Sequence, residues 1–281
     1  MRARDIGLIA FLIVLKSPIV VADDQPAKDK DLAKKLEVVS RDLKSPVPAQ
    51  RVRGVEAIAK MGKDGAGATR LLCAALVDRH HTVRQAASEA LEKVNPDFRE
   101  IVFPIVVEDD AAPRLASLNK LRDAGEKASA AFPVVLFRLR TLQSSKRDSA
   151  RESSACLETL FAIAKDDKAV SEVIFSLASN TEARHSLLHR QALGYLPNIE
   201  IDDSKRVVNM LTDLVKNDSD ENKPIAMNQL AKYGRKAKSA IEILRKSKAS
   251  PSAEVRQAAA AALSTIEEDV AAARKSVERK P

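Results

Sequence analysis

The sequence predicts an all-α protein, an α-α superhelix built from about seven stacked helix pairs. Three observations lead to this fold class. The composition favours helices with small side chains at their contacts. One long segment of the chain matches another without gaps, and helix ends recur at a regular interval along the chain.

The composition suits closely packed helices. Hydrophobic residues make up 45% of the 281 residues, and most of them are Ala, Leu, Val and Ile, which is enough to build a sizeable core. The chain has 7 Phe, 2 Tyr, no Trp and 8 Gly. A β-sandwich would need more turn glycines and more strand aromatics, so the composition argues against that class.

A long internal match indicates a repeat. Residues 59–91 align without gaps on residues 231–263. The clearest matches are Ala59-Lys60-x-Gly62 with Ala231-Lys232-x-Gly234, and Val83-Arg84-Gln85-Ala86-Ala87 with Val255-Arg256-Gln257-Ala258-Ala259. The offset of 172 positions corresponds to about five units of about 34 residues, so diverged copies are expected between the two segments.

Helix ends recur between these copies. Helical runs stop at Met61-Gly62, Val94-Asn95-Pro96, Ala124-Gly125, Ala164-Lys165, Leu193-Gly194 and Tyr233-Gly234. Glycine suits the left-handed position after a helix because it has no Cβ to clash. The expected helix pairs are 28–43 with 48–61, 67–77 with 82–94, 98–107 with 112–124, 127–142 with 148–165, 168–179 with 183–195, 203–216 with 220–233, and 236–247 with 252–276.

The second and last of these pairs resemble HEAT repeats. Asp78 is followed by Val83-Arg84 and then by Ala86, Ala87, Ala90 and Leu91, and residues 255–263 keep the second part of this pattern. Two further runs, Phe103-Pro104-Ile105-Val106 and Phe132-Pro133-Val134-Val135, resemble the proline-bearing first helix of such a repeat. The resemblance covers about residues 28–276 and implies a HEAT/armadillo-like solenoid.

The resemblance also implies a structural ladder between turns. In this family the turn aspartate pairs with the arginine of the following helix, which here means Asp78 with Arg84. Two units depart from the pattern. The sixth has Pro224-Ile225 in place of the Val-Arg pair, and the last has Ser250 in place of the turn aspartate. These departures make a regular ladder doubtful but leave the helical pairing intact.

Helix amphipathicity explains why such pairs would stack. In the run from Val83 to Val94, apolar residues recur at helical spacing and form one stripe, while the opposite face is charged. A single pair cannot bury its stripes, but stacked pairs can. We therefore expect the second helices to line a concave surface that binds a protein partner, and the basic net charge permits an acidic one. The polar residues expected to reach that partner are Arg53, Glu56, Arg84, Arg114 and Arg256.

The N-terminus predicts export. Residues 1–22 read as a charged segment, an apolar run from Ile6 to Leu15 and a small-residue cleavage site ending at Ala22, which is typical of a signal peptide. The run is shorter than the roughly 20 residues that span a membrane. An uncleaved anchor and a core helix are the alternatives. The expected mature chain is periplasmic or secreted, with a short linker at 23–27, the solenoid at 28–276 and a charged tail at 277–281.

The sequence contains no motif for catalysis, a metal or a cofactor. It has no Gly-x-Ser-x-Gly elbow, no phosphate-binding lysine loop and no dinucleotide fingerprint. Its four histidines are His80, His81, His185 and His189; the last two have the spacing of a helical ligand pair but lack companion ligands. Cys73 and Cys156 each lie in an apolar run and are expected to be buried thiols.

Other functions remain open at this stage. The net charge is +8, and basic residues gather in two clusters: Arg138, Arg140, Lys146, Arg147 and Arg151, and Arg235, Lys236, Lys238, Arg245, Lys246 and Lys248. Binding of nucleic acid or a phosphate ligand through these clusters is the main alternative. Export and the scarcity of stacking aromatics argue against nucleic acid. An enzyme such as a HEAT-like lyase is less expected. The oligomeric state is not predicted.

Overall fold

The described part of the chain is an all-α solenoid of seven helix pairs. The computed structural model describes residues 25–143, 150–180, 186–198 and 204–278, and all regular structure in these ranges is helical. The pairs are α1 (Gln25–Leu43) with α2 (Pro48–Lys60), α3 (Thr69–Leu76) with α4 (His81–Val94), α5 (Pro96–Val107) with α6 (Ala111–Ala124), α7 (Phe132–Gln143) with α8 (Ala150–Ala164), α9 (Lys168–Ser179) with α10 (Leu187–Tyr195), α11 (Ser204–Asn217) with α12 (Lys223–Lys232), and α13 (Ile241–Ser247) with α14 (Ala253–Glu278). We number these pairs as units 1 to 7.

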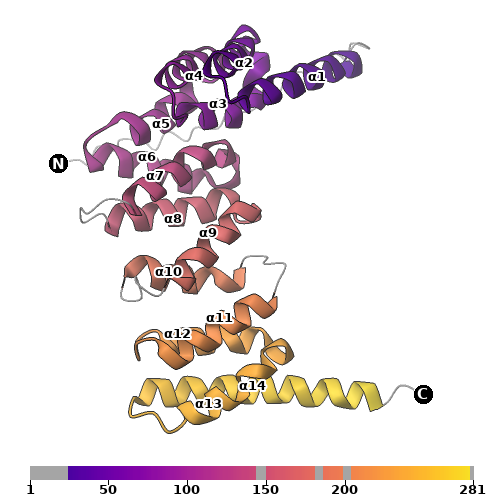
Figure 1. The fold of residues 1–281 in the computed structure, drawn as a ribbon, viewed down its shortest axis with the longest axis vertical. Coiled ribbons are helices and arrows are strands. Elements are labelled where there is room, and N and C mark those ends of the chain that lie inside the picture. The colour runs from indigo at the N-terminus through magenta and orange to yellow at the C-terminus, as the bar shows by residue number, and fades with distance from the viewer. Residues whose placement is uncertain (1–24, 144–149, 181–185, 199–203, 279–281) are drawn as a thin grey trace, which may run out of the picture.

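The units stack in chain order, from indigo at one end of Figure 1 to yellow at the other. This arrangement confirms the predicted fold class. The expected signal peptide at 1–22 lies outside the described residues. Two predicted boundaries need correction: residues 25–27, expected in the linker, lie in α1, and residues 277–278, expected in the tail, lie in α14.

The second helix of each unit belongs to the inner row of the stack. α2 packs closely on α4, α6 on α8 and α12 on α14, whereas the first helices of the same units make fewer contacts with one another. The second helices therefore form the more closely packed row of the stack, and their predicted place on a concave side stays a prediction.

The stack is irregular at unit 3. α4 makes little contact with α6, and α3 instead packs on α7. The guanidinium of Arg70 on α3 lies 5.0 Å from the centre of the Phe132 ring at the start of α7. Its Nη2 also donates to Asp167 Oδ2 at 2.5 Å, a contact between residues 97 positions apart. Contacts in this half of the molecule therefore extend beyond neighbouring units.

Three glycines set the links between units. Gly62, Gly125 and Gly234 have φ of 56°, 58° and 50°, a left-handed conformation that strains residues with a Cβ. Each is the first residue of a short 3-10 segment: η1 (Gly62–Ala68), η2 (Gly125–Ala131) and η5 (Gly234–Ala240). Gly194, expected to end its helix in the same way, lies inside α10 instead.

The internal match predicted from the sequence is structural as well. η1, α3 and α4 begin at residues 62, 69 and 81, and η5, α13 and α14 begin 172 positions later in each case. Val83, Ala87 and Leu91 are buried in α4, and Val255, Ala259 and Leu263 are buried at the corresponding positions of α14. Units 2 and 7 therefore use the same residues for the same packing.

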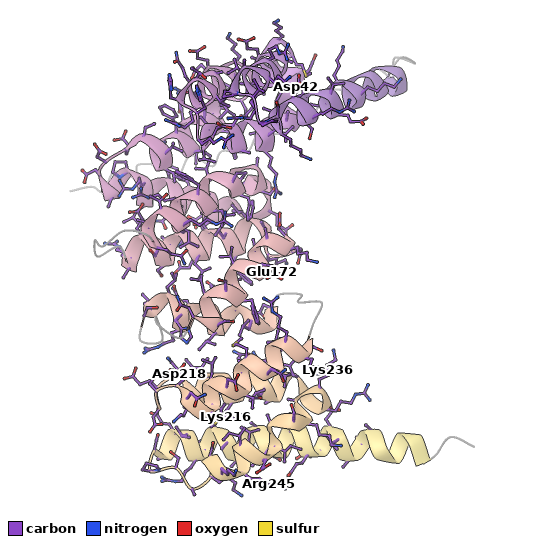
Figure 2. The ribbon with its side chains drawn as sticks, viewed as in Figure 1. Asp42, Glu172, Lys216, Asp218, Lys236 and Arg245 are labelled. Carbon is purple, nitrogen blue, oxygen red and sulfur yellow. The ribbon has the colours of Figure 1, made fainter. Side chains whose placement is uncertain are left out.

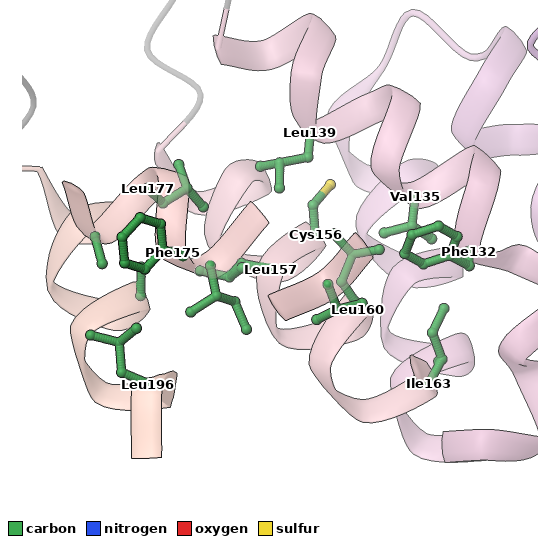
Figure 3. Close-up of a cluster of buried hydrophobic side chains, with 14 of the residues drawn as sticks. Phe132, Val135, Leu139, Cys156, Leu157, Leu160, Ile163, Phe175, Leu177 and Leu196 are labelled. Atoms are coloured by element: carbon green, nitrogen blue, oxygen red, sulfur yellow. The ribbon is translucent and has the colours of Figure 1, made fainter. Parts of the chain in front are cut away.

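One continuous core runs between the two helix rows. Figure 3 shows its middle part, where Leu139 on α7 faces Cys156 on α8 and Phe175 and Leu177 approach from α9. Both cysteines are buried and unpaired, as expected. Burial raises the pKa of each thiol to about 12, so neither is reactive near neutral pH.

Candidate interaction surface

An arginine fixes the turn before several second helices. Arg51, Arg84, Arg114 and Arg256 are each the fourth residue of their helix. In each case Nη1 donates to main-chain carbonyls five or six residues earlier, such as those of Asp78 and Arg79 for Arg84, at 2.8 and 3.1 Å. The corresponding acceptors are Ser45 and Pro46 for Arg51, Glu108 for Arg114, and Ser250 and Pro251 for Arg256. We call this contact the turn staple.

Arg51 also links unit 1 to unit 2. Its Nε and Nη2 donate to the two carboxylate oxygens of Asp78 at 2.7 and 2.8 Å. Burial raises the pKa of Asp78, but the hydrogen bonds from Arg51 and from the main-chain nitrogen of His80, with the charge of Arg51, outweigh it, so the pKa is lowered. The expected pairing of Asp78 with Arg84 is therefore wrong. Arg84 reaches the Asp78 main chain, and the carboxylate faces the arginine of the preceding unit.

A second rung of this kind links units 3 and 4. Arg114 donates through Nε and Nη2 to both oxygens of Glu152 at 2.7 and 2.8 Å, and Arg138 of α7 donates to the same carboxylate at 2.6 and 3.2 Å. Burial opposes the charge on Glu152, but the two guanidinium groups lower its pKa to about 2. We call these inter-unit pairs rungs.

The turn staples change the predicted partner-binding set. Arg114 is only 6% exposed and is occupied by Glu152 and Glu108, so its predicted role at a partner surface is wrong. Arg84 and Arg256 are directed by their turn staples toward their own turns rather than across the inner face. Arg53 and Glu56 remain exposed on α2, where a partner could reach them. The sequence pattern identified these arginines but not their acceptors.

The histidines occupy unlike environments. His80 and His81, the N-cap and the first residue of α4, stack on one another with ring centres 5.1 Å apart. His189 is buried on α10, and His185 lies outside the described residues. Within the described ranges, no three His, Cys, Asp or Glu side chains are grouped so that they could hold a metal ion.

The basic clusters are partly neutralised. In the first cluster Arg138 is bound to Glu152, and Lys146 and Arg147 lie outside the described residues. In the second, Arg245 pairs with Glu267 at 2.7 Å and Lys246 with Glu242 at 3.1 Å. Figure 2 shows Lys236 at the edge of the stack opposite Asp218. Lys236 belongs to η5, one of the short segments that link two units.

The inner face carries aromatic residues in units 4 to 6. Phe161, Tyr195 and Tyr233 lie at the C-terminal ends of α8, α10 and α12, and each is half-buried. The rings of Phe161 and Tyr195 stack with centres 4.3 Å apart across two units. Burial raises the pKa of both tyrosines, so their hydroxyl groups stay protonated at neutral pH. We call these three residues, with the helix surface between them, the aromatic face.

Polar side chains border the aromatic face. Gln191 Nε2 donates to Ser154 Oγ at 2.5 Å and to Glu158 Oε1 at 3.2 Å, which ties α10 to α8. Arg122 of α6 donates to the other oxygen of Glu158 at 3.4 Å. This network fixes one amide and one carboxylate beside the stacked rings, where they could orient a bound chain.

A glutamine precedes each tyrosine by one helical turn. Gln191 and Tyr195 on α10 correspond to Gln229 and Tyr233 on α12. The Oε1 atoms of both glutamines are buried without a hydrogen-bond partner among the described residues. Such an acceptor is unfavourable unless a donor reaches it. The Gln-x-x-x-Tyr spacing was the sequence signal that could have revealed this face.

Units 1 to 3 have a different inner surface. Their second helices expose several charged side chains of both signs: Arg53, Glu56 and Lys60 on α2, Glu89, Glu92 and Lys93 on α4, and Lys120 and Asp123 on α6. By contrast, α8, α10 and α12 each expose one, namely Arg151, Arg190 and Lys232. The aromatic face is therefore the least charged part of the inner row.

Within the described ranges, none of the helices combines the length and the apolar character needed to span a membrane.

No protein-family model matches the sequence, and no curated protein matches it. Among solved structures, the chain is similar to an engineered protein at 17% identity, with 85% of this chain and 97% of that one covered and a TM-score of 0.30. A designed armadillo repeat protein is similar at 19% identity, with coverages of 82% and 99% and a TM-score of 0.28. Similarities this distant do not bear on what the chain binds.

Proposed function

We propose that this protein is a non-enzymatic scaffold that binds a segment of another protein on its aromatic face. The observation that carries the proposal is the stack of Phe161 on Tyr195, which is partly exposed on the inner row beside the fixed amide of Gln191. Rigid aromatic rings bordered by oriented polar groups are typical of interaction hot spots. The lack of catalytic motifs in the sequence supports a binding role over an enzymatic one.

The proposed partner is recognised by apolar and amide contacts rather than by negative charge. An acidic partner was expected because of arginines on the second helices, and Arg84, Arg114 and Arg256 are engaged by their own turns or by Glu152. The exposed pair that remains, Arg53 and Glu56, carries opposite charges. We propose that the protein acts in the periplasm or outside the cell, on the basis of the signal-like residues 1–22.

Tyrosine fluorescence offers a direct test of binding at this face. The chain has no Trp, and its two tyrosines both belong to the aromatic face. Linear peptides without Tyr or Trp, selected from a displayed random library, should therefore change the tyrosine emission on binding. We expect Tyr195→Ala to weaken a selected peptide by about tenfold or more, as at other hot spots.

The matched control for this test lies on the charged part of the inner row. Glu89→Ala on α4 removes an exposed side chain outside the aromatic face and should leave the affinity unchanged. Equal losses for both variants, or selected peptides that never alter tyrosine emission, would place the binding surface elsewhere.

Export is tested separately, by locating the protein after fractionation of cells that express the full chain. Retention in the cytoplasm would refute that part of the proposal.

A further inference from the structure

The outer side of unit 7, at the end of the stack, has a groove between α13 and α14. Its volume is about 650 Å³, and it is lined by Arg245 and Lys248 on one wall and by Ala260, Leu263, Ser264 and Glu267 on the other. Figure 2 shows Arg245 at this end of the stack. α13 and α14 pack on each other, on η5 and on unit 6, so no further unit in the described part of the chain covers the groove.

The same surface of unit 2 is covered by a helix of the next unit. The offset of 172 positions places Ala260 on Ser88 and Ser264 on Glu92. There α5 packs on α4, and Arg99 of α5 reaches both positions. Its Nε donates to the main-chain oxygen and to Oγ of Ser88 at 3.3 Å, and its Nη1 lies 3.1 Å from Glu92 Oε2. The groove of unit 7 therefore corresponds to a surface that receives a helix elsewhere in this chain.

The two surfaces differ in charge. Leu76 and Glu92 of unit 2 correspond to Lys248 and Ser264 of unit 7. Leu76 is buried, whereas Lys248 is exposed. The carboxylate that pairs with Arg99 is therefore missing from unit 7, and an ammonium group replaces a buried apolar side chain. A helix that docks on unit 7 is complementary to this surface if it carries a carboxylate in place of the arginine.

Lys248 is not neutralised by its surroundings. It is exposed, and no carboxylate of the described residues pairs with its ammonium group. Arg245 pairs with Glu267 at 2.7 Å through Nη2, but its side chain is 66% exposed, which leaves its other donors accessible. Ser264 donates to Glu268, an acidic residue outside the lining, at 2.6 Å. The α13 wall therefore offers two cationic side chains to one incoming carboxylate.

A second copy of the chain does not match this charge. At the opposite end of the stack, the described part of α1 exposes Lys34, Lys35 and Arg41 against Glu37. End-to-end stacking of two copies would bring these cations against the α13 wall, which is unfavourable. Residues 279–281, Arg-Lys-Pro, add positive charge as well. Charge complementarity therefore favours a different protein with an acidic helix.

We propose that the groove of unit 7 binds an amphipathic helix of a partner protein, with a carboxylate in its first turn where α5 carries Arg99. The carboxylate pairs with Lys248 and Arg245, and the apolar side of the helix covers Ala260 and Leu263, as α5 covers the equivalent surface of unit 2. The groove lies at the end of the stack, outside the aromatic face. It is therefore a second binding surface, and it does not depend on the function proposed above.

A charge-swap experiment with the full chain tests this site. The probes are two peptides that copy residues 95–107, a parent with Arg99 and a variant with Arg99→Glu, both kept helical by a covalent bridge between side chains. The variant peptide should bind the wild-type protein about tenfold more tightly than the parent peptide does. Lys248→Glu in the protein should reverse this preference, because it returns a carboxylate to the groove.

A fluorophore beside the groove reports the binding. It is attached to Ala261→Cys, an exposed position next to the lining residue Ala260, while the two native cysteines are buried and unreactive. The matched control Lys120→Glu makes the same charge change on α6, in unit 3, and should keep the preference of the wild type.

Failure of the variant peptide to bind, equal affinities of the two peptides, or the same reversal in Lys120→Glu as in Lys248→Glu would overturn the proposal. Sedimentation of the protein alone tests the competing occupant. Self-association that Lys248→Glu abolishes would assign the groove to a second copy and would also overturn the proposal. None of these readouts uses the aromatic face, so they are separate from the test of the proposed function.

Discussion

The junctions at the two arginine rungs and the junction between units 5 and 6 are built differently. Arg51 and Arg114 each contact a carboxylate of the next unit through two hydrogen bonds, between helices that pack closely. His189 faces Asp218 at 3.4 Å without a hydrogen bond, between helices that pack sparsely. The fourth residue of α10 is again an arginine, Arg190, but its ion pair with Glu221 is exposed, so it should contribute less than the buried rungs.

The largest effect is expected at the Arg114 rung. Arg114→Ala removes both hydrogen bonds to the buried Glu152 and leaves Arg138 as its remaining partner. We expect a loss of about 3–5 kcal/mol in the free energy of unfolding, the usual cost of breaking a buried ion pair. Chemical denaturation measures it. His189→Gln at the sparser junction should cost less, and equal losses at the two positions would break the comparison.

The links between units provide a second, smaller contrast. Gly62 and Gly234 are equivalent and both have positive φ, so alanine is strained at either position. A Cβ at Gly62 would meet no atom within 4 Å, whereas at Gly234 it would collide with the carboxylate of Asp269, which accepts from Arg235 N at 2.6 Å. Gly234→Ala should therefore lower the melting temperature more than Gly62→Ala. The left-handed backbone strains an alanine by about 1–3 kcal/mol at either position. Equal melting temperatures would contradict the close contact.

The buried rung at Glu152 should weaken in acid. The pKa of Glu152 is lowered from 4.5 to about 2, so its contribution to stability is complete above the unfolded value and is lost as the pH falls toward 2. Hydrogen exchange of the α6 and α8 amides, measured as the pH is lowered, tests this. Unchanged protection of these helices in acid would contradict the role of the rung.

The smallest effect is expected where a turn staple acts without a rung. Arg256 donates to the carbonyls of Ser250 and Pro251 and makes no ion pair among the described residues. Arg256→Ala should cost about 1 kcal/mol, the net value of ordinary hydrogen bonds. Comparison with Arg114→Ala then gives the contribution of the rung itself. A loss at Arg256 as large as that at Arg114 would assign the stability to the turn staple.

Local sequence signals predicted the helices but not their partners. Gly62 and Gly234 follow helices at matching positions, and the stripe from Val83 to Val94 is buried as expected. The acceptor of Arg51 lies 27 residues away, and that of Arg114 lies 38 residues away, so no local pattern specifies them. The aromatic face was missed because Phe161 and Tyr195 come together only through the stacking of separate units.

The contact between Arg70 and Asp167 restricts the order in which this solenoid can fold. Most solenoid units need only the next unit to be synthesised before they are complete. Here α3 packs on α7, so its final surroundings do not exist until the polypeptide has been extended well past unit 3. A nascent chain that ends before Phe132 leaves this side of α3 uncovered. The first four units should consequently reach their final packing together during translation, and not one after another.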